Sequence, residues 1–385
     1  MSDAAVGSTP AVDDPRLAPA LRWGVLGAGW IGGSFADAVR DLTSSTVVAA
    51  GSRDAAKAAA FAAEHGVERS YGSYEELVAD PDVDAVYVAT PHSHHHEHAL
   101  LAIAAGKHVL VEKAFTRNAA EAREVVAAAR AAGVFCMEAM MTRHLPHTAM
   151  LREIVQRGDI GTVREVRAGF DVTVPYDPAH RMFDPALAGG ALLDLGIYPL
   201  SFAVDLLGHP DEVRATGLLA PTGVDAQETI VLRYGQEALA TLTTSVRTTA
   251  PGTATIVGSE GRIEIDERYL VPTTFRVENA QGVTEYDGRL RAEDGSVVEE
   301  GKQYEAAEVA RCIAAGLTES PRMTLDQTVA LMEIMDDVRA QLGVVYPGEE
   351  GPASGVAPSP MSAAASVFVA GPSAGASGSS GTATT

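Results

Sequence analysis

WGVLGAGWIG, residues 23–32, joins a short apolar run to a helical stretch through a glycine-rich turn. A Gly-x-Gly-x-x-Gly motif binds dinucleotides when it follows a strand and opens a helix, and this sequence predicts both. Gly27 is expected to form the tight turn, Gly29 to let a pyrophosphate approach the backbone, and Gly32 to allow close helix–strand packing. Trp30 and Ile31 begin the helix whose N-terminus would face the phosphates. The alternative is a glycine-rich turn in another α/β fold.

The sequence on either side of the motif alternates between strands and helices over residues 21–145. Apolar runs such as TVVAAGS (46–52), DAVYVAT (84–90) and HVLVEK (108–113) are separated by Ala-rich stretches of helical length. Strands alternating with helices of this length indicate parallel βαβ units. We therefore predict an α/β Rossmann domain over residues 21–145.

The pattern changes after about residue 162, where strands follow one another with little helix between them. They include VREVRAGFDVTV (163–174), QETIVLRY (227–234) and EALATLTTSV (237–246), and helices are expected at 190–208, 304–315 and 325–342. This pattern predicts an α+β domain over 146–346, built on a large open, mostly antiparallel sheet. Residues 1–20 and 347–385 are rich in small residues and proline, and we expect them to be disordered.

Composition excludes several classes of protein. The chain has 385 residues, with 29 Lys and Arg against 51 Asp and Glu, so its net charge is −22. This charge disfavours nucleic acid and anionic membranes as partners. Cys136 and Cys312 are too few for a disulfide framework or a multi-cysteine metal site. Without a predicted membrane span or secretory signal, we expect a cytoplasmic location.

The cofactor type is indicated by the residues about twenty positions after the motif. An NAD enzyme usually has an acidic residue there, which binds the ribose 2′-hydroxyl. This chain has Ser52 and Arg53, whose hydroxyl and guanidinium suit a 2′-phosphate. Asp54 is the alternative ribose ligand, but a role as N-cap of the next helix explains it better. The sequence therefore favours NADP, with NAD as the alternative.

Three motifs in order resemble the glucose–fructose oxidoreductase / inositol dehydrogenase family (Gfo/Idh/MocA). They are the glycine motif, VATPHSHHHEHALLAIAAGKHVLVEKAF (88–115) and AGGALLDLGIYPL (188–200). Within the family, EAMMTRHLP (138–146) and the segment 181–198 most resemble dimeric dihydrodiol dehydrogenases and NADP-dependent D-xylose dehydrogenases. The resemblance covers about residues 21–345. It implies a Rossmann domain, an open-sheet domain and a homo-oligomer, either dimer or tetramer.

The resemblance also implies site residues. Thr90, Pro91 and His96 would lie beside the nicotinamide, and Glu112 and Lys113 match the family's Glu-Lys-Pro. Arg143 and Arg181 are implied as substrate-binding residues, although either could be a salt-bridged surface arginine. One departure is Ala114, which stands where the family has proline. Alanine restrains the backbone less than proline does, so the position of Lys113 is less constrained.

The chemistry requires a base that removes a hydroxyl proton while hydride leaves the carbon. Asp194 and Tyr198 are four residues apart, which places them on one face of a helix. Tyrosine needs its pKa lowered by about 3 units to act near neutral pH. One cation about 4 Å away, at an effective dielectric of about 20, supplies the corresponding ~4 kcal/mol. Lys113 is the expected cation, and Asp194 should face the lysine or the substrate.

Five histidines between residues 92 and 98 include pairs with the i, i+4 spacing of helical metal ligands. The string lacks the H-E-x-x-H pattern, and we predict no metal site.

The sequence thus predicts an NADP-dependent oxidoreductase. It would transfer hydride between the nicotinamide and a secondary alcohol or hemiacetal carbon of a sugar or cyclic trans-diol. Two alternatives remain, an NAD-retaining glycosidase of the same fold and a non-catalytic dinucleotide-binding regulator.

Overall fold

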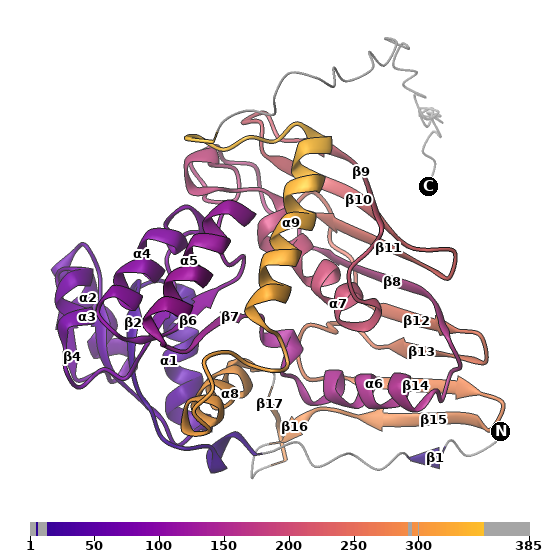
Figure 1. Cartoon of the computed structure of the whole chain (residues 1–385), viewed down its shortest axis with the longest axis horizontal. Helices are drawn as coiled ribbons and strands as arrows, with labels where there is room; N and C mark the ends of the chain where they lie inside the picture. Colours follow the sequence, from indigo (N-terminus) through magenta and orange to yellow (C-terminus); the bar gives the residue numbers. More distant parts are fainter. Residues whose placement is uncertain (1–4, 7–13, 292–294, 299, 350–385) are drawn as a thin grey trace, which may run out of the picture. The chain divides into compact units, whose positions relative to one another are not determined.

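The computed structural model describes residues 5–6, 14–291, 295–298 and 300–349, and its first sheet confirms the predicted parallel arrangement (Figure 1). Six parallel strands lie in the order β4-β3-β2-β5-β6-β7, which reverses between β2 and β5. This reversal is the topological switch point of a doubly wound sheet, where such folds bind ligands at the carboxyl ends of the strands. The strands are β2 (Arg22–Leu26), β3 (Thr46–Gly51), β4 (Arg69–Tyr71), β5 (Ala85–Val88), β6 (His108–Glu112) and β7 (Cys136–Ala139). The helices are α1 (Trp30–Leu42), α2 (Ala55–His65), α3 (Tyr74–Ala79), α4 (His92–Ala104) and α5 (Ala119–Ala132).

The second sheet is the predicted large and mostly antiparallel one. Its strands lie in the order β1-β15-β14-β13-β12-β8-β11-β10-β9, and the pairs β8–β11 and β1–β15 are parallel. The strands are β1 (Ala5–Val6), β8 (Val163–Asp171), β9 (Glu212–Leu219), β10 (Asp225–Tyr234), β11 (Ala238–Ser245), β12 (Ala254–Gly258), β13 (Gly261–Ile265), β14 (Thr274–Asn279) and β15 (Gly282–Asp287). A separate small ribbon pairs β16 (Leu290–Arg291) with β17 (Val297–Val298).

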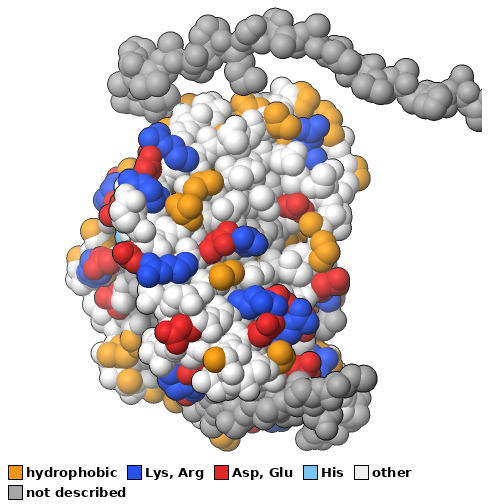
Figure 2. Space-filling view, turned by 90° about the vertical axis from the view of Figure 1, so that its right-hand side faces the viewer, with side chains coloured by type: hydrophobic (Ala, Val, Ile, Leu, Met, Phe, Trp, Pro, Cys, Tyr) orange, Lys and Arg blue, Asp and Glu red, His pale blue; other side chains and the backbone are white. Residues whose placement is uncertain are grey.

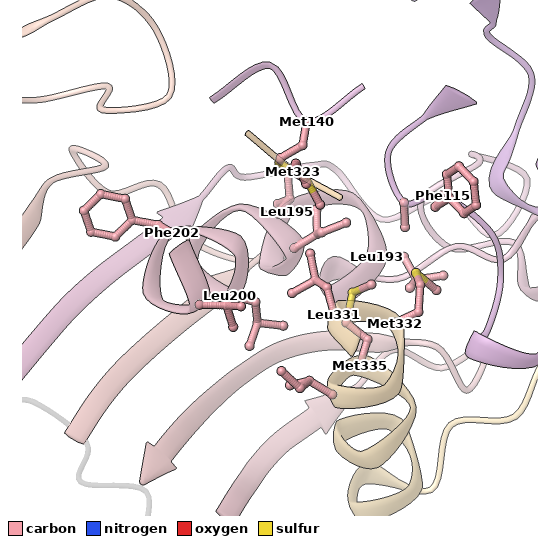
Figure 3. Packing of buried hydrophobic residues seen from close by; sticks show 14 of the residues in the cluster. Phe115, Met140, Leu193, Leu195, Leu200, Phe202, Met323, Leu331, Met332 and Met335 are labelled. Carbon is pink, nitrogen blue, oxygen red and sulfur yellow. The ribbon is translucent and has the colours of Figure 1, made fainter. Parts of the chain in front are cut away.

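Helices from the C-terminal half connect the two sheets. Helices α6 (Pro146–Arg157) and α7 (Ile197–Leu207) precede α8 (Lys302–Ala314) and α9 (Leu325–Leu342). Helix α8 packs in the buried cluster that contains Trp23 and Phe35 of the first sheet layer. Helix α9 contributes Leu331, Met332 and Met335 to the cluster that contains Leu193 and Leu200 (Figure 3). The chain therefore returns to the first sheet after building the second, while the domain boundaries at 145/146 and 346/347 stay predictions.

Both predicted disordered ends are partly wrong. Residues Pro15–Leu17 form a 3₁₀ turn, capped by Asp14, and Ala18 is buried, so the last part of the expected leader is ordered. At the other end, Glu349 binds Arg339 at 2.8 Å and accepts a hydrogen bond from Asn118, which ties the chain to α9 and α5. Specific ion pairs order these residues although their composition suggests disorder. Residues 350–385, the rest of the predicted tail, lie outside the described residues.

Several short elements were missing from the sequence prediction, namely β4, β14, β15, α3 and α6. Strands β14 and β15 lie near one edge of the large sheet, and none of the residues of β15 is buried. A strand without a buried face has a weak period-two pattern. The pairing of β15 with β14, which in turn pairs with β13, makes it a strand.

The glycine motif has the predicted geometry. Gly27 has φ +118°, and a Cβ there would lie 2.7 Å from the Ala89 carbonyl oxygen. A Cβ on Gly32 would lie 2.6 Å from the Gly27 carbonyl oxygen, so this residue allows α1 to pack closely on the turn. A Cβ on Gly29 would meet no described atom within 4 Å. The motif is therefore tight on its protein side and open at Gly29.

One stretch, Pro185–Leu207, is long and apolar enough in composition to cross a membrane. Its most apolar window is 89% buried inside the fold, and it includes α7. This burial identifies it as a core helix of the second layer, covered by the large sheet and by α9.

The large sheet carries mixed charge on the side shown in Figure 2, where basic and acidic side chains lie next to one another with scattered hydrophobic ones. The structure pairs neighbouring charges along and between its strands, as in Arg167–Glu165, Arg262–Glu264 and Arg276–Glu264. Leu218, Leu219 and Leu239 are among its exposed hydrophobic residues. The predicted homo-oligomer stays a prediction.

We expect Gly27→Ala to lower the free energy of unfolding by at least about 2 kcal/mol, because the side chain meets a carbonyl at a strained backbone conformation. Gly29→Ala is the matched control and should unfold within about 1 kcal/mol of wild type, since its Cβ enters open space. Urea titration of both variants measures this difference, and equal destabilisation by the two substitutions would contradict it.

Candidate active site

A buried ion pair joins the two sheets at the carboxyl end of β6. Lys113 follows β6, and its Nζ donates to Asp194 Oδ1 at 3.0 Å and to the Asp194 carbonyl oxygen at 2.7 Å. Both side chains are only 11% exposed. The lysine comes from the first sheet and the carboxylate from the helical segment of the second. The predicted contact between Asp194 and Lys113 is therefore present.

Two more groups face the same carboxylate. Arg181 donates to Asp194 Oδ2 at 3.0 Å, and its side chain is 55% exposed. His92 Nε2 lies 3.9 Å from Asp194 Oδ1, while its Nδ1 contacts the Ala188 carbonyl oxygen at 3.1 Å. Burial lowers the pKa of His92 to about 3, so this ring is neutral near pH 7. The structure thus brings Arg181, one of the two predicted substrate-binding arginines, to the site.

Electrostatics keeps both members of the pair charged. Burial alone would raise the pKa of Asp194, but Lys113 and Arg181 outweigh it and hold the pKa below its ordinary value. Burial alone would lower the pKa of Lys113, but Asp194, Tyr198 and Glu112 together outweigh it and raise the pKa. The pair is consequently an ammonium and a carboxylate across the whole neutral range.

Local packing sets the position of Asp194. Leu192–Gly196 form a short π-helix that runs into α7. Its first amide, on Leu192, donates to the buried carboxylate of Asp225 at 2.6 Å. Leu193 belongs to the same buried cluster as Phe115, which lies two residues after Lys113 (Figure 3). The apolar residues that flank each charged residue therefore pack in one core and hold the two charges together.

Tyr198 lies near Lys113 as predicted, but its acidity differs from the expectation. Lys113 Nζ is 4.9 Å from the centroid of the Tyr198 ring, and Phe170 packs against the ring edge-on at 5.6 Å. Burial raises the pKa of Tyr198, and Lys113 lowers it by less than burial, Glu112 and Asp194 raise it. The expected lowering of the Tyr198 pKa toward neutral is wrong, because burial, with smaller contributions from Glu112 and Asp194, outweighs the effect of Lys113. Tyr198 is a neutral phenol near pH 7.

Glu112 is held inside the fold. It is 7% exposed, accepts a hydrogen bond from the Tyr87 hydroxyl, and accepts another from the Lys113 amide at 3.2 Å. Burial raises its pKa. The structure therefore places Glu112 behind Lys113, where it contacts the lysine backbone; the predicted contact with the cofactor stays untested.

The contacts of His96 are with protein side chains, and its predicted place beside the nicotinamide stays a prediction. His96 Nε2 contacts Glu124 of α5 at 2.8 Å, on the outer side of α4. The neighbouring His95 is 1% exposed and contacts the Thr90 carbonyl oxygen at 2.7 Å and the Ala114 carbonyl oxygen at 2.8 Å. Helix phase separates the two rings, because successive residues of α4 point about 100° apart.

Arg143 lies in the interior and faces no groove. It is 2% exposed, donates to Ser201 Oγ at 2.8 Å and binds Asp205 at 2.9 Å. Arg152 shares the same carboxylate at 2.7 Å. The structure thus gives Arg143 buried contacts with α7 residues, and its predicted contact with the substrate stays a prediction.

Two grooves border the glycine turn and the chain after β3. An open groove of about 920 Å³ lies between α1 and α2 and is lined by Ala28, Gly29 and the 83% exposed Trp30, together with the acidic side chains of Asp37, Asp41, Glu64 and Glu300. Ile31 packs against the buried cluster that contains Trp23 and Phe35. A second groove of about 460 Å³ is lined by Arg53, Tyr74, Glu75, His94, Glu97 and His98. The open side of Gly29 leaves backbone amides accessible, as pyrophosphate binding requires. These residues fit a dinucleotide.

The neighbouring predicted residues have defined contacts. Asp54 Oδ1 accepts from the Ala56 amide at 2.9 Å, which confirms its role as N-cap of α2. Ser52 is buried, and its hydroxyl accepts from the Asp54 amide at 3.3 Å. Thr90 Oγ1 contacts His98 Nδ1 at 3.0 Å, and Pro91 is the N-cap of α4. Arg53 is therefore the predicted 2′-phosphate ligand that lines a groove.

Within residues 14–291, 295–298 and 300–349, no group of three or more His, Cys, Asp or Glu side chains is arranged to hold a metal ion.

Comparison with known proteins matches both halves of the chain. Residues 21–140 match a model described as "Oxidoreductase family, NAD-binding Rossmann fold", and residues 148–264 match the GFO/IDH/MocA C-terminal domain. Trans-1,2-dihydrobenzene-1,2-diol dehydrogenase of Danio rerio is 39% identical over 334 residues, which cover 85% of this chain and 98% of that protein. The Homo sapiens protein of the same name is 36% identical, with 86% and 99% covered.

Two solved structures are similar to this chain over most of its length. An NAD binding oxidoreductase from Klebsiella pneumoniae has a TM-score of 0.73 and 26% identity, with 84% of this chain and 96% of that chain covered. KijD10, a 3-ketoreductase from Actinomadura kijaniata in complex with NADP and TDP-benzene, has a TM-score of 0.69 and 27% identity, with 83% and 97% covered.

We expect Asp194→Asn to lower the free energy of unfolding by about 3 kcal/mol at pH 7, because it leaves the buried Lys113 without its charge partner. The lowered pKa of Asp194 means that its contribution is present above the unfolded-state pKa, about 4, and is lost as the pH falls through the folded-state pKa. The difference from wild type should therefore shrink below about pH 4.

Urea unfolding between pH 7 and pH 2 measures this difference. Arg181→Ala is the control, and its cost should stay below about 1 kcal/mol because that arginine is more than half exposed. An Asp194→Asn variant as stable as wild type at pH 7 would contradict the expectation.

Proposed function

The chain belongs to the Gfo/Idh/MocA family of oxidoreductases and is an NAD(P)-dependent dehydrogenase; from this premise we propose its substrate, cofactor preference and catalytic residues. The proposed reaction interconverts a secondary alcohol or hemiacetal of a cyclic trans-diol or sugar with the corresponding carbonyl compound, using NADP. The names of the relatives above support this substrate class. The observation that carries the proposal is the convergence of Lys113, Asp194 and Tyr198 at the carboxyl end of β6.

Tyr198 is the proposed acid and base. The nicotinamide, when bound, gives hydride to a carbonyl carbon or takes it from an alcohol carbon. In the reductive direction the neutral phenol donates its proton to the carbonyl oxygen, which suits the raised pKa. In the oxidative direction the phenolate takes the hydroxyl proton, so this direction needs Tyr198 to ionise first.

Lys113 and Asp194 act on that ionisation. The lysine ammonium lies close to the Tyr198 ring and stabilises negative charge on the phenol. Asp194 opposes this while it is bound to Lys113. A substrate hydroxyl that donates a hydrogen bond to Asp194 would weaken the interaction between this carboxylate and Lys113. The Lys113 ammonium would then stabilise the Tyr198 phenolate more strongly. Arg181, half exposed on the other side of Asp194, is placed to contact the same substrate.

Arg53 is the proposed determinant of cofactor preference. It lines the second groove, together with His94 and His98, where the chain after β3 meets the start of α4. Asp54, the alternative ribose ligand, is engaged as a helix cap. A guanidinium recognises a phosphate through paired hydrogen bonds, whereas a 2′-hydroxyl gains little from it. These observations support NADP over NAD.

We further propose that the protein is a cytoplasmic homo-oligomer. The support is the resemblance to dimeric members of the family and the net charge of −22, which disfavours membrane and nucleic-acid partners.

Tyr198→Phe should lower turnover by about 10²- to 10⁴-fold while the KM for NADP stays within about threefold of wild type. In wild type, the oxidative kcat should rise with pH from 7 toward 10, because the raised pKa keeps the phenolate a minor species that grows tenfold per pH unit. Steady-state rates of both proteins over this range measure the effect. The residual rate of Tyr198→Phe should lack this slope, and a turnover like that of wild type would remove Tyr198 from the role assigned to it.

Initial rates of nicotinamide reduction with NADP and with NAD, over a panel of aldoses, inositols and cyclic trans-diols, test the cofactor and the substrate class together. We expect activity with NADP and a trans-diol or aldose.

Arg53→Ala should raise the KM for NADP at least tenfold, through loss of a charged hydrogen-bond partner, and leave the KM for NAD almost unchanged. Arg157→Ala, an exposed arginine of α6 that lines neither groove, is the control. Equal effects on both cofactors would contradict the assignment, and bound cofactor without net reduction would favour the glycosidase alternative.

A further inference from the structure

The turn that carries Lys113 lies entirely inside the protein. Ala114 and Phe115 are both 0% exposed, and Phe115 packs in the large cluster near Leu193 (Figure 3). Water therefore does not reach the backbone of these residues. A buried amide without a partner costs as much as a lost hydrogen bond, so each polar group of this turn needs a partner within the protein.

Side chains from three elements supply those partners. Glu112 Oε2 accepts from the Lys113 amide at 3.2 Å, and His95 contacts the Ala114 carbonyl oxygen at 2.8 Å. Glu138 Oε1 accepts from the Phe115 amide at 3.0 Å. The turn is thus held at three successive residues by side chains rather than by a backbone ladder.

Glu138 is the partner that comes from a different strand. It lies in β7, opposite Val111 of β6, and its side chain reaches past the end of β6 to the amide of Phe115. It is 1% exposed, and burial raises its pKa to about 7. A carboxyl at such a position is costly compared with an apolar side chain, and Thr328, the Phe115 amide and the charge of Arg143 offset part of that cost.

We propose that Glu138 is a positioning residue for Lys113, whose hydrogen bond to the Phe115 amide restrains the turn that lacks the family's proline at position 114. This inference rests on the proposed function, because it assigns Glu138 an effect on the reaction that Lys113 assists. Proline would restrain this turn through its ring, which fixes φ. Ala114 has no ring, so the restraint falls to side chains that bind the backbone on either side of it. Glu138 acts only through the turn and does not touch Asp194 or Tyr198 in the described contacts.

Two substitutions separate this role from a structural one. Glu138→Gln keeps an oxygen that accepts from the Phe115 amide, and it should keep kcat within about threefold of wild type. Glu138→Met has a similar length, fills the same space and accepts no hydrogen bond from the amide. It should unfold in urea at a midpoint near that of wild type, because an apolar side chain replaces a buried carboxyl. Its kcat should nevertheless fall at least tenfold, with the KM for NADP within threefold.

A third substitution restores the restraint by another route. Ala114→Pro should recover most of the lost kcat when it is added to Glu138→Met, and it should change the wild-type kcat little. No described residue accepts a hydrogen bond from the Ala114 amide, so the proline removes none that the structure shows. Glu308→Met is the matched control: this carboxyl is 5% exposed in α8 and binds Ser320 at 2.6 Å, and its loss should leave kcat unchanged.

Each outcome decides the inference. A wild-type kcat in Glu138→Met, an equal loss in Glu138→Gln, or no recovery with Ala114→Pro would overturn it. A Glu138→Met chain that fails to fold would overturn it as well, since Glu138 would then be required for the fold as a whole. The wild-type protein is assayed beside the variants. Its inactivity with every substrate would count against the proposed function, whereas an active wild type with an equally active Glu138→Met counts against the positioning role alone.

Discussion

The buried ion pair between Lys113 and Asp194 is the constraint on which the rest of the site depends. It joins the end of a parallel strand to a helical segment of the second layer. Both side chains are too buried for water to solvate either charge in place of its partner. Two charges in such a place are stable only together. The surrounding core, with Phe115 on one side and Leu193 on the other, holds them at contact distance. The relative position of lysine and tyrosine follows from this pairing.

The same pair determines the resting protonation state. Because Asp194 balances Lys113, the field on Tyr198 is weaker than a lone ammonium would give, and burial keeps the phenol neutral. A neutral phenol can donate a proton, which in the proposed mechanism suits the reductive direction. Oxidation requires the charge balance around Asp194 to change, and Arg181 and the substrate hydroxyls are the groups that reach this carboxylate from the exposed side.

Strong local patterns made most of the Rossmann domain and the long strands of the second sheet predictable. The glycine turn, the βαβ alternation, the helix capped by Asp54 and the long strands of the second sheet depend on residues close together in sequence. Edge strands such as β15 were not predictable, because their polar faces carry little period-two signal. The sequence could not show that His95 would bind the turn after β6 while His96 pairs with Glu124, nor that Asp205 would hold Arg143 in the interior. Glu138 gave no sign of its role, since an acidic residue in an apolar strand does not name its partner.

The sequence by itself determined the glycine turn of the Rossmann domain and the order of the two sheets, because each rests on short patterns whose geometry is local. The tertiary structure alone decided which charges neutralise one another. Lys113 and Asp194 are 81 residues apart, and Arg143 and Asp205 are 62 apart. Only packing brings such groups within a few ångströms, where Coulomb interactions and desolvation set their protonation states. The acidity of Tyr198, which the sequence predicted with the wrong sign, is therefore a property of the folded core and not of the motif that contains it.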